Sequence, residues 1–188
     1  TSGRTRVSAL RPIHILAISG SLRAQSKNSE VLLAAQRFAP NEFAVRLYQG
    51  LESLPHYNPD LDCEECVLPA PVQQLREALG AVDALIISSP EYAHGVPGSL
   101  KNALDWLVSG PEMVRKPTGL LTASAMSKHA PAALVETLNT MSANVVTSAV
   151  RVVPLGGRRM TADRILEDPT LADEIRGTLQ ALRAVVLP

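Results

Sequence analysis

The chain is poor in aromatic residues and cysteine, and it carries no excess charge of either sign. Phenylalanine, tryptophan and tyrosine make up 3% of its 188 residues, and 18 acidic residues balance 18 basic ones. A formal net charge of zero gives no broad basic surface, so we predict that the protein binds neither nucleic acid nor an anionic membrane. No apolar run approaches the roughly 20 residues that a membrane-spanning helix needs.

The first eleven residues lack the apolar segment of a secretory signal peptide, although they include Arg4, Arg6 and Arg11. We predict a disordered leader over residues 1–11 and a single domain over residues 12–188. The length is sufficient for one domain with a substantial core and short for two. The expected location is the cytoplasm.

The only two cysteines form one C-x-x-C motif, Cys63-Glu64-Glu65-Cys66. Two cysteines cannot complete the tetrahedral shell of a structural zinc ion, so no metal site is predicted within the chain. The acidic, proline-bounded surroundings do not favour a reactive thiolate. We expect two reduced thiols. A metal site shared between subunits and a disulfide are the alternatives.

Five short apolar segments alternate with amphipathic helical patterns along the chain. The expected strands cover residues 13–18, 43–47, 84–87, 119–121 and 145–153, with Thr147-Ser148 as a candidate interruption of the last. Helical patterns are centred on residues 31–38, 71–82, 99–108, 131–141 and 169–182. This alternation predicts an α/β fold, a parallel sheet of five strands with helices on both faces. For such a doubly wound sheet we expect the strand order 2-1-3-4-5, in which strands one and three flank the switch point.

The loop after the first strand is rich in groups that donate hydrogen bonds. It lies before the N-terminus of a helix, where free N–H groups and the helix dipole favour an anion. Gly20 is its only glycine, so neither common glycine-rich phosphate motif is present. The loop therefore suits a terminal phosphate monoester better than a pyrophosphate, although an ordinary polar loop with a helix cap explains the same residues. The candidate residues are Ser19, Gly20, Ser21, Arg23, Ser26, Lys27 and Asn28.

The loop after the third strand, Pro90–Gly98, has a restricted backbone course because it contains Pro90, Gly95, Pro97 and Gly98. A restricted loop can present its N–H and C=O groups to a flat heterocycle at low entropic cost. Tyr92 adds an aromatic face or a hydroxyl. In the predicted strand order, this loop lies beside the first loop at the switch point of the sheet, where ligands bind.

With both loops in view, the chain resembles the NADPH-dependent FMN reductase family of flavodoxin-like proteins, which includes chromate, quinone and azo-dye reductases. The segments that carry the resemblance are GSLRAQSKN at residues 20–28 and PEYAHGVPGSLKNALDW at residues 90–106. It covers the body of the chain from about His14 to Val153. The resemblance implies a flavodoxin-like fold, bound FMN, and NADPH or NADH as co-substrate.

The resemblance also implies roles for individual residues. Ser21, Arg23, Ser26 and Asn28 would hold the FMN phosphate, and Pro90, Glu91, Tyr92 and Ala93 would line the ribityl chain and the isoalloxazine. Glu91 could instead form an inter-subunit salt bridge, and residues 101–106 would support the loop. Many relatives have Asn where this chain has Ala93, and a glycine-rich loop where it has residues 122–129. Ser124 in that loop could still reach the pyrimidine edge of the flavin; His94 and His129 are expected to face solvent.

The implied activity is NAD(P)H-dependent oxidoreduction by a ping-pong mechanism, in which hydride reduces FMN and two electrons then reduce a small acceptor. The expected acceptors are quinones, free flavin, azo compounds and chromate. The expected assembly is a homodimer or homotetramer. No catalytic side chain is predicted, because the flavin carries the redox chemistry. The alternatives are a single-electron carrier, which would typically be strongly acidic, and an FMN-binding redox module without turnover.

Overall fold

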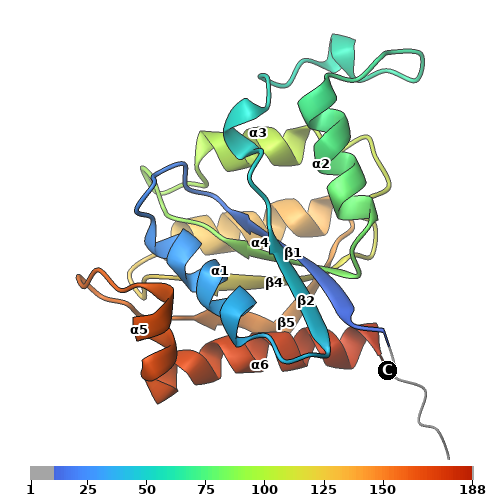
Figure 1. Cartoon of the computed structure of the whole chain (residues 1–188). Helices are drawn as coiled ribbons and strands as arrows, with labels where there is room; N and C mark the ends of the chain where they lie inside the picture. Colours follow the sequence, from blue (N-terminus) through green and yellow to red (C-terminus); the bar gives the residue numbers. More distant parts are fainter. Residues whose placement is uncertain (1–10, 188) are drawn as a thin grey trace, which may run out of the picture.

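The computed structural model describes residues 11–187, so residues 1–10 of the predicted leader lie outside the described part. A five-stranded, all-parallel sheet in the order β2-β1-β3-β4-β5 forms the centre of the molecule (Figure 1). This confirms the predicted flavodoxin-like fold class. The strands are β1 (Ile13–Ser19), β2 (Phe43–Leu47), β3 (Ala84–Ser88), β4 (Pro117–Thr122) and β5 (Asn144–Val152).

The two central strands are apolar because both of their faces are covered. In β1 only His14 is exposed, and every residue of β3 is buried. Their register pairs Ser19 with Ser88, so the two strands end level with each other. The polar loops that follow β1 and β3 therefore leave the sheet at the same edge.

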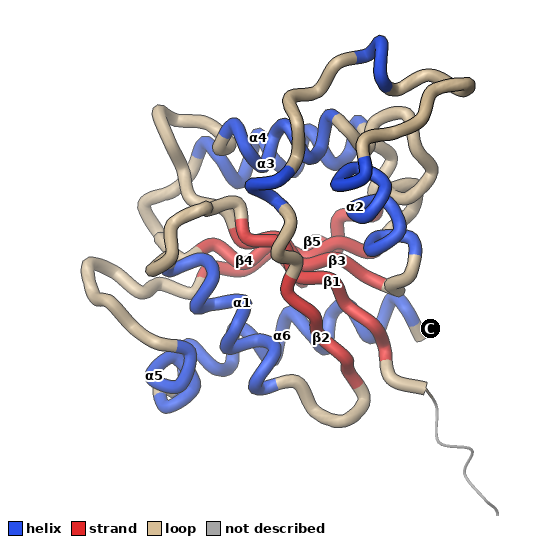
Figure 2. The backbone as a smooth tube through the Cα atoms, turned by 45° about the horizontal axis from the view of Figure 1, so that its top comes forward, coloured by secondary structure: helices blue, strands red, loops and turns tan. Residues whose placement is uncertain are grey.

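Helices cover both faces of the sheet (Figures 1 and 2). One layer packs against a core that includes Ile15 and Ala17, and the other against a core that includes Leu16 and Ile18, since alternate side chains of a strand point to opposite faces. The first layer contains α1 (Lys27–Phe38), α5 (Ala162–Glu167) and α6 (Pro169–Val186); the second contains α2 (Ala70–Gly80), α3 (Gly98–Asp105) and α4 (His129–Thr140).

Two local features of the structure depart from the regular pattern of strands and helices that the apolar residues predict. The pairing of β5 with β4 shifts between Val145 and Val150, which places an irregularity across the predicted interruption at Thr147-Ser148. Helix α5 was not predicted because its six residues are too few to show a periodic apolar face. Its start is nevertheless marked, since Thr161 caps it by accepting a hydrogen bond from the Arg164 N–H at 3.4 Å.

The β2–α2 segment, residues 48–69, projects beyond α2 and α3 in Figure 1. Here the expectation of two reduced thiols is wrong, because Cys63 and Cys66 form a disulfide. A turn closed by the Cys66 N–H to the Cys63 carbonyl, at 3.0 Å, brings their Cα atoms to 5.0 Å, within the range a disulfide requires. The segment is tied to α3 through the Pro55 carbonyl, which accepts hydrogen bonds from the side chains of Asn102 and Trp106 at 2.9 and 2.8 Å.

Candidate functional site

A cavity of about 410 Å³ opens where the loops after β1, β3, β4 and β5 meet. This is the edge of the sheet at which a doubly wound fold binds ligands. The cavity is lined by Ser21, Arg23, Gln25, Ser26, Lys27, Asn28, Ser89, Pro90, Glu91, Tyr92, Ala123, Ser124, Ser127, Gly157 and Arg159. Most of the predicted site residues are therefore brought together by the fold.

The β1–α1 loop contributes three buried polar side chains to this cavity. Ser26 is the N-cap of α1 and accepts a hydrogen bond from the Ser29 N–H at 3.4 Å. Ser21 accepts one from the Arg23 N–H at 3.3 Å, and Asn28 Oδ1 accepts one from Ser88 Oγ at 3.0 Å. Each side chain acts here as an acceptor, which leaves hydroxyl and amide hydrogens to donate to an anion.

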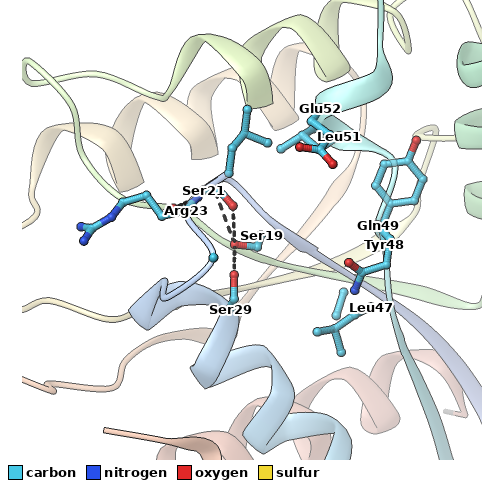
Figure 3. A pocket seen from close by; sticks show the side chains of 12 residues that line it. Ser19, Ser21, Arg23, Ser29, Leu47, Tyr48, Gln49, Leu51 and Glu52 are labelled. Carbon is cyan, nitrogen blue, oxygen red and sulfur yellow. Dashed lines mark hydrogen bonds between the residues drawn. The ribbon is translucent and has the colours of Figure 1, made fainter. Parts of the chain in front are cut away.

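Two cations border the same loop in different ways. The Lys27 ammonium donates to the Gly156 carbonyl, which links the start of α1 to the loop after β5. Arg23 is exposed, and Figure 3 shows its side chain extending away from Tyr48, Gln49 and Glu52. A charge-assisted pair of hydrogen bonds from a guanidinium suits phosphate oxygens. Arg23 thus offers the cavity a cation that does not hold the fold together.

Ser19 lines a second, smaller cavity of about 250 Å³ beside Leu47, Tyr48 and Gln49 (Figure 3). Its hydroxyl lies 2.9 Å from Ser29 Oγ and accepts a hydrogen bond from the Ser21 N–H at 3.3 Å. These contacts fix the course of the β1–α1 loop. Ser19 therefore borders the larger cavity only indirectly, although Ser21 and Arg23 line both.

Gly20, Ala93 and Gly95, which were also predicted, are not among the residues that line the larger cavity. A Cβ at Gly20 would lie 2.8 Å from Ser89 Oγ and 3.0 Å from a Leu100 methyl group, so glycine allows the loops after β1 and β3 to approach closely. Gly95 closes a turn in which it exchanges two backbone hydrogen bonds with Tyr92, at 2.9 and 3.1 Å. Ala93 lies within that turn at φ +48°.

Glu91 connects the loop after β3 to helix α4. Its Oε2 accepts hydrogen bonds from the backbone N–H groups of His129 and Ala130, at 2.8 and 2.9 Å. The bond from Ala130 is the main cause that lowers the pKa of the Glu91 carboxyl. Glu91 therefore caps a helix within its own chain as well as lining the cavity, a role that its sequence context did not indicate.

The loops after β4 and β5 complete the wall. Ser124 lines the cavity and accepts a hydrogen bond from the Met126 N–H at 3.2 Å. Arg159, held by a 2.9 Å hydrogen bond to Gln25, was missed by the sequence analysis. Its signal was available, since Gly156-Gly157-Arg158-Arg159 follows the last strand just as the polar loops follow β1 and β3.

Comparison with known proteins assigns the chain to a family. The family model described as NADPH-dependent FMN reductase matches residues 13–156, which include every strand and the cavity-lining loops after β1, β3 and β4. This protein is a member of the NADPH-dependent FMN reductase family. The resemblance stated from the two loop segments is confirmed.

Two similar proteins are named as reductases. A protein named NAD(P)H-dependent FMN reductase PA1204, from Pseudomonas aeruginosa, is 39% identical over 115 residues, which cover 60% of each chain. A quinone reductase of Escherichia coli K12 is 35% identical over 114 residues, again 60% of each chain. The matched stretch thus spans less than two thirds of these relatives.

Solved structures agree on the fold. The flavoenzyme NAD(P)H:(acceptor) oxidoreductase FerB from Paracoccus denitrificans superposes with a TM-score of 0.77 at 24% identity, over 93% of this chain and 97% of that one. The apo form of the NADH:FMN oxidoreductase EMOB superposes with a TM-score of 0.60 at 20% identity, over 92% of this chain and 89% of that one. At these identities the likeness establishes the architecture alone.

Among the described residues, no helix has both the length and the apolar content needed to cross a membrane.

Proposed function

We propose that this family member is an FMN-containing oxidoreductase that takes hydride from NAD(P)H and reduces small acceptors. The observation that carries the proposal is the larger cavity, whose one end presents donors suited to a phosphate monoester and whose other end is open and bordered by Tyr92. Its volume of about 410 Å³ is within the range of about 300–1,000 Å³ typical of small-molecule sites. The family assignment supports the same cofactor.

The donor set fits the FMN phosphate. Ser21 and Ser26 offer hydroxyl hydrogens, Asn28 offers its amide, and Arg23 offers a guanidinium beside the N-terminus of α1. These groups all belong to the short stretch from Ser21 to Asn28 at the start of one helix. They therefore suit the single terminal phosphate of FMN better than the pyrophosphate of FAD.

At the other end, the rigid Pro90–Gly98 loop and the Ala123–Ser127 wall would hold the ring from its edges. Tyr92 is 50% exposed, which leaves an aromatic face at the mouth of the cavity. When bound, FMN supplies the site that accepts hydride and passes on two electrons. Glu91 is the only carboxylate in the cavity lining, and it is engaged as a helix cap. We therefore assign it no proton transfer, and the residues of this chain would bind and orient the reactants.

Because the flavin would carry the redox chemistry, NAD(P)H and the acceptor would both have to reach the same ring, which predicts one shared site for them. With the loops supporting one side of the ring, one flat molecule can stack on the open side at a time. NAD(P)⁺ must then leave before a quinone, free flavin, azo compound or chromate reacts. We propose a ping-pong order on this ground.

Anaerobic stopped-flow mixing with NADPH, followed by a second mix with a quinone, tests the proposal. NADPH alone should reduce the protein-bound FMN completely, and the quinone should reoxidise it. Steady-state double-reciprocal plots should be parallel. Intersecting lines with a ternary complex would contradict the shared site. Absence of reduction by NADPH or NADH would indicate an FMN-binding module without turnover, and delivery of electrons only to one-electron acceptors would indicate a carrier.

The proposal treats residues 12–188 as one FMN-binding domain that assembles as a homodimer or homotetramer in the cytoplasm. All six described α-helices contribute buried residues to the two cores that flank the single sheet, which supports one domain. Light scattering of the purified protein measures the assembly, and a monomer at micromolar concentration would contradict it.

A further inference from the structure

Two histidines that are distant in the sequence meet beside Glu91, which lines the larger cavity. The imidazole rings of His94 and His129 have their centroids 4.3 Å apart, tilted by 58°, and Glu91 lies beside them. One ligand atom from each of the three side chains lies within 4.8 Å of the other two. Within residues 11–187, this is the one group of three or more potential metal-ligating side chains that meet in this way.

We propose that Glu91, His94 and His129 form a binding site for one divalent transition-metal ion, with Zn²⁺ as the best-suited ion. Two imidazole nitrogens and one carboxylate oxygen form a ligand set that suits Zn²⁺, Cu²⁺ or Ni²⁺ and not the oxygen-preferring Mg²⁺ or Ca²⁺. Three protein ligands leave a fourth position for water or another small ligand, as in open zinc sites.

The backbone around the two histidines is fixed, whereas their rings are free to adjust. His94 follows Ala93 in the turn closed by Tyr92 and Gly95, and it adopts φ +60°. His129 is the first residue of α4. Both side chains are exposed, so rotation about their χ angles can bring the nitrogens to the roughly 2.0–2.1 Å that zinc requires.

Glu91 is positioned to complete the site. Both hydrogen bonds from α4 go to its Oε2, so Oε1 is available to a metal ion. These bonds also orient the carboxylate, as hydrogen bonds to a metal-ligating carboxylate commonly do. The negative charge of Glu91 lies between the positive N-terminus of α4 and the proposed ion, which offsets the repulsion that the helix end would otherwise exert on a cation.

A bound ion would join the loop after β3 to helix α4 beside the cavity that Glu91 lines. Glu91 and His94 come from the loop, and His129 from the helix. The proposal concerns these side chains alone and does not depend on the flavin or on turnover. Its failure and that of the proposed oxidoreductase function are therefore distinguishable.

Isothermal titration of the purified full-length protein with ZnCl₂, with and without added FMN and in a buffer free of thiols and chelators, tests the site. We expect one Zn²⁺ per chain, and no comparable heat with MgCl₂ or CaCl₂. His94→Ala and His129→Ala should each weaken the affinity by about tenfold or more, since even the outer partners of metal ligands have effects of this size. His56→Ala is the matched control, because His56 is exposed on the β2–α2 segment outside the cluster, and it should bind zinc as the unmodified protein does.

Two further measurements guard against misleading results. The titration is repeated in the Cys63→Ser/Cys66→Ser background, where binding should persist, because reduced thiols could also take up zinc. With Cu²⁺ in place of Zn²⁺, the electron paramagnetic resonance spectrum should show coupling to two imidazole nitrogens and lose one in each histidine variant. Absence of one-to-one zinc binding, equal loss in His56→Ala, or unchanged binding in both His94→Ala and His129→Ala would overturn the proposal.

Discussion

The two ends of the larger cavity are built in different ways. The phosphate end comes from one continuous stretch, Ser21–Asn28, whose side chains are arranged around the start of α1. The ring end is assembled from the loops after β3 and β4, which meet only because the strands lie side by side. The proposed anion binding would therefore depend on local geometry, whereas the shape of the proposed ring end would depend on long-range packing.

The same difference appears in what the polar side chains do. At the proposed phosphate end, Arg23 is exposed and extends away from Tyr48 and Gln49. At the ring end, Glu91 spans two elements by capping α4 from the loop after β3. A substitution at the first position should change ligand affinity and leave the fold intact, while one at the second should alter stability. The predictions below test this contrast.

The largest expected effect is at the phosphate end. Arg23→Ala should weaken FMN binding by about 1.5–3 kcal/mol, roughly 10- to 150-fold in Kd, because a charge-assisted hydrogen bond is lost. The melting temperature of the flavin-free protein should not change. Fluorescence titration measures the affinity. Arg46→Ala, at an exposed arginine of β2 outside the cavity lining, is the control and should bind FMN normally. Equal affinity for FMN in both variants would contradict the assignment.

Asn28 links the β1–α1 loop to the end of β3, because its side chain accepts a hydrogen bond from the Ser88 hydroxyl. Its substitution should therefore affect both FMN affinity and stability. Asn28→Ala leaves the buried Ser88 hydroxyl without its acceptor, and we expect a loss of about 1–2 kcal/mol in the free energy of unfolding. Urea denaturation of the flavin-free protein measures this. Asn139→Ala, at an exposed position of α4, should be close to neutral. If the two variants had the same stability, the link between the loops would be unimportant.

At the ring end, Ala93→Gly should stabilise the protein slightly. Ala93 adopts φ +48°, which is unfavourable for a residue with a Cβ, and glycine removes this cost but adds unfolded-state entropy. The net gain should be about 0.5–1 kcal/mol by chemical denaturation. Ala24→Gly, in the phosphate loop and outside the positive-φ residues, should not be stabilising. A loss of stability at Ala93 would show that the turn is not strained.

The smallest effect should be at Glu91 and should depend on pH. Its pKa is lowered in the folded protein, so its contribution to stability is present above the unfolded-state pKa of about 4.3 and is lost as pH falls through the lower folded value. Glu91→Gln should therefore melt at a slightly lower temperature near neutral pH, measured with EDTA present. The difference should disappear in acid. Glu64→Gln, on the exposed tip of the β2–α2 segment, should show no such trend.

Features that depend on consecutive residues could be predicted from the sequence. The apolar run from Ile13 to Ile18 identified β1, and Asp168-Pro169 identified the start of α6, where Asp168 accepts hydrogen bonds from the N–H groups of Thr170 and Leu171. The parallel sheet followed from the alternation of strands and helices, and its order is that of the doubly wound sheet that was expected. The donors of the β1–α1 loop were also evident, because they surround a helix N-terminus within a few residues.

Features that depend on how side chains meet in space could not be predicted from the sequence pattern. Nothing near Glu91 in the sequence indicates that its partner is the start of α4, and nothing near His94 indicates His129. The disulfide was judged from its acidic neighbours, yet the turn at Cys63–Cys66 decides whether the sulfur atoms can meet. Ser19 stays a predicted phosphate donor, and its hydroxyl also lies 2.9 Å from Ser29 Oγ and accepts a hydrogen bond from the Ser21 N–H at 3.3 Å.

A titration with FMN and with riboflavin, which lacks the phosphate, tests the central account most directly. The unmodified protein should bind FMN far more tightly than riboflavin. Arg23→Ala should remove much of this difference by weakening FMN binding alone, because only the phosphate end has changed. Equal affinity of the unmodified protein for FMN and riboflavin, or no flavin binding at all, would contradict the assignment of the cavity.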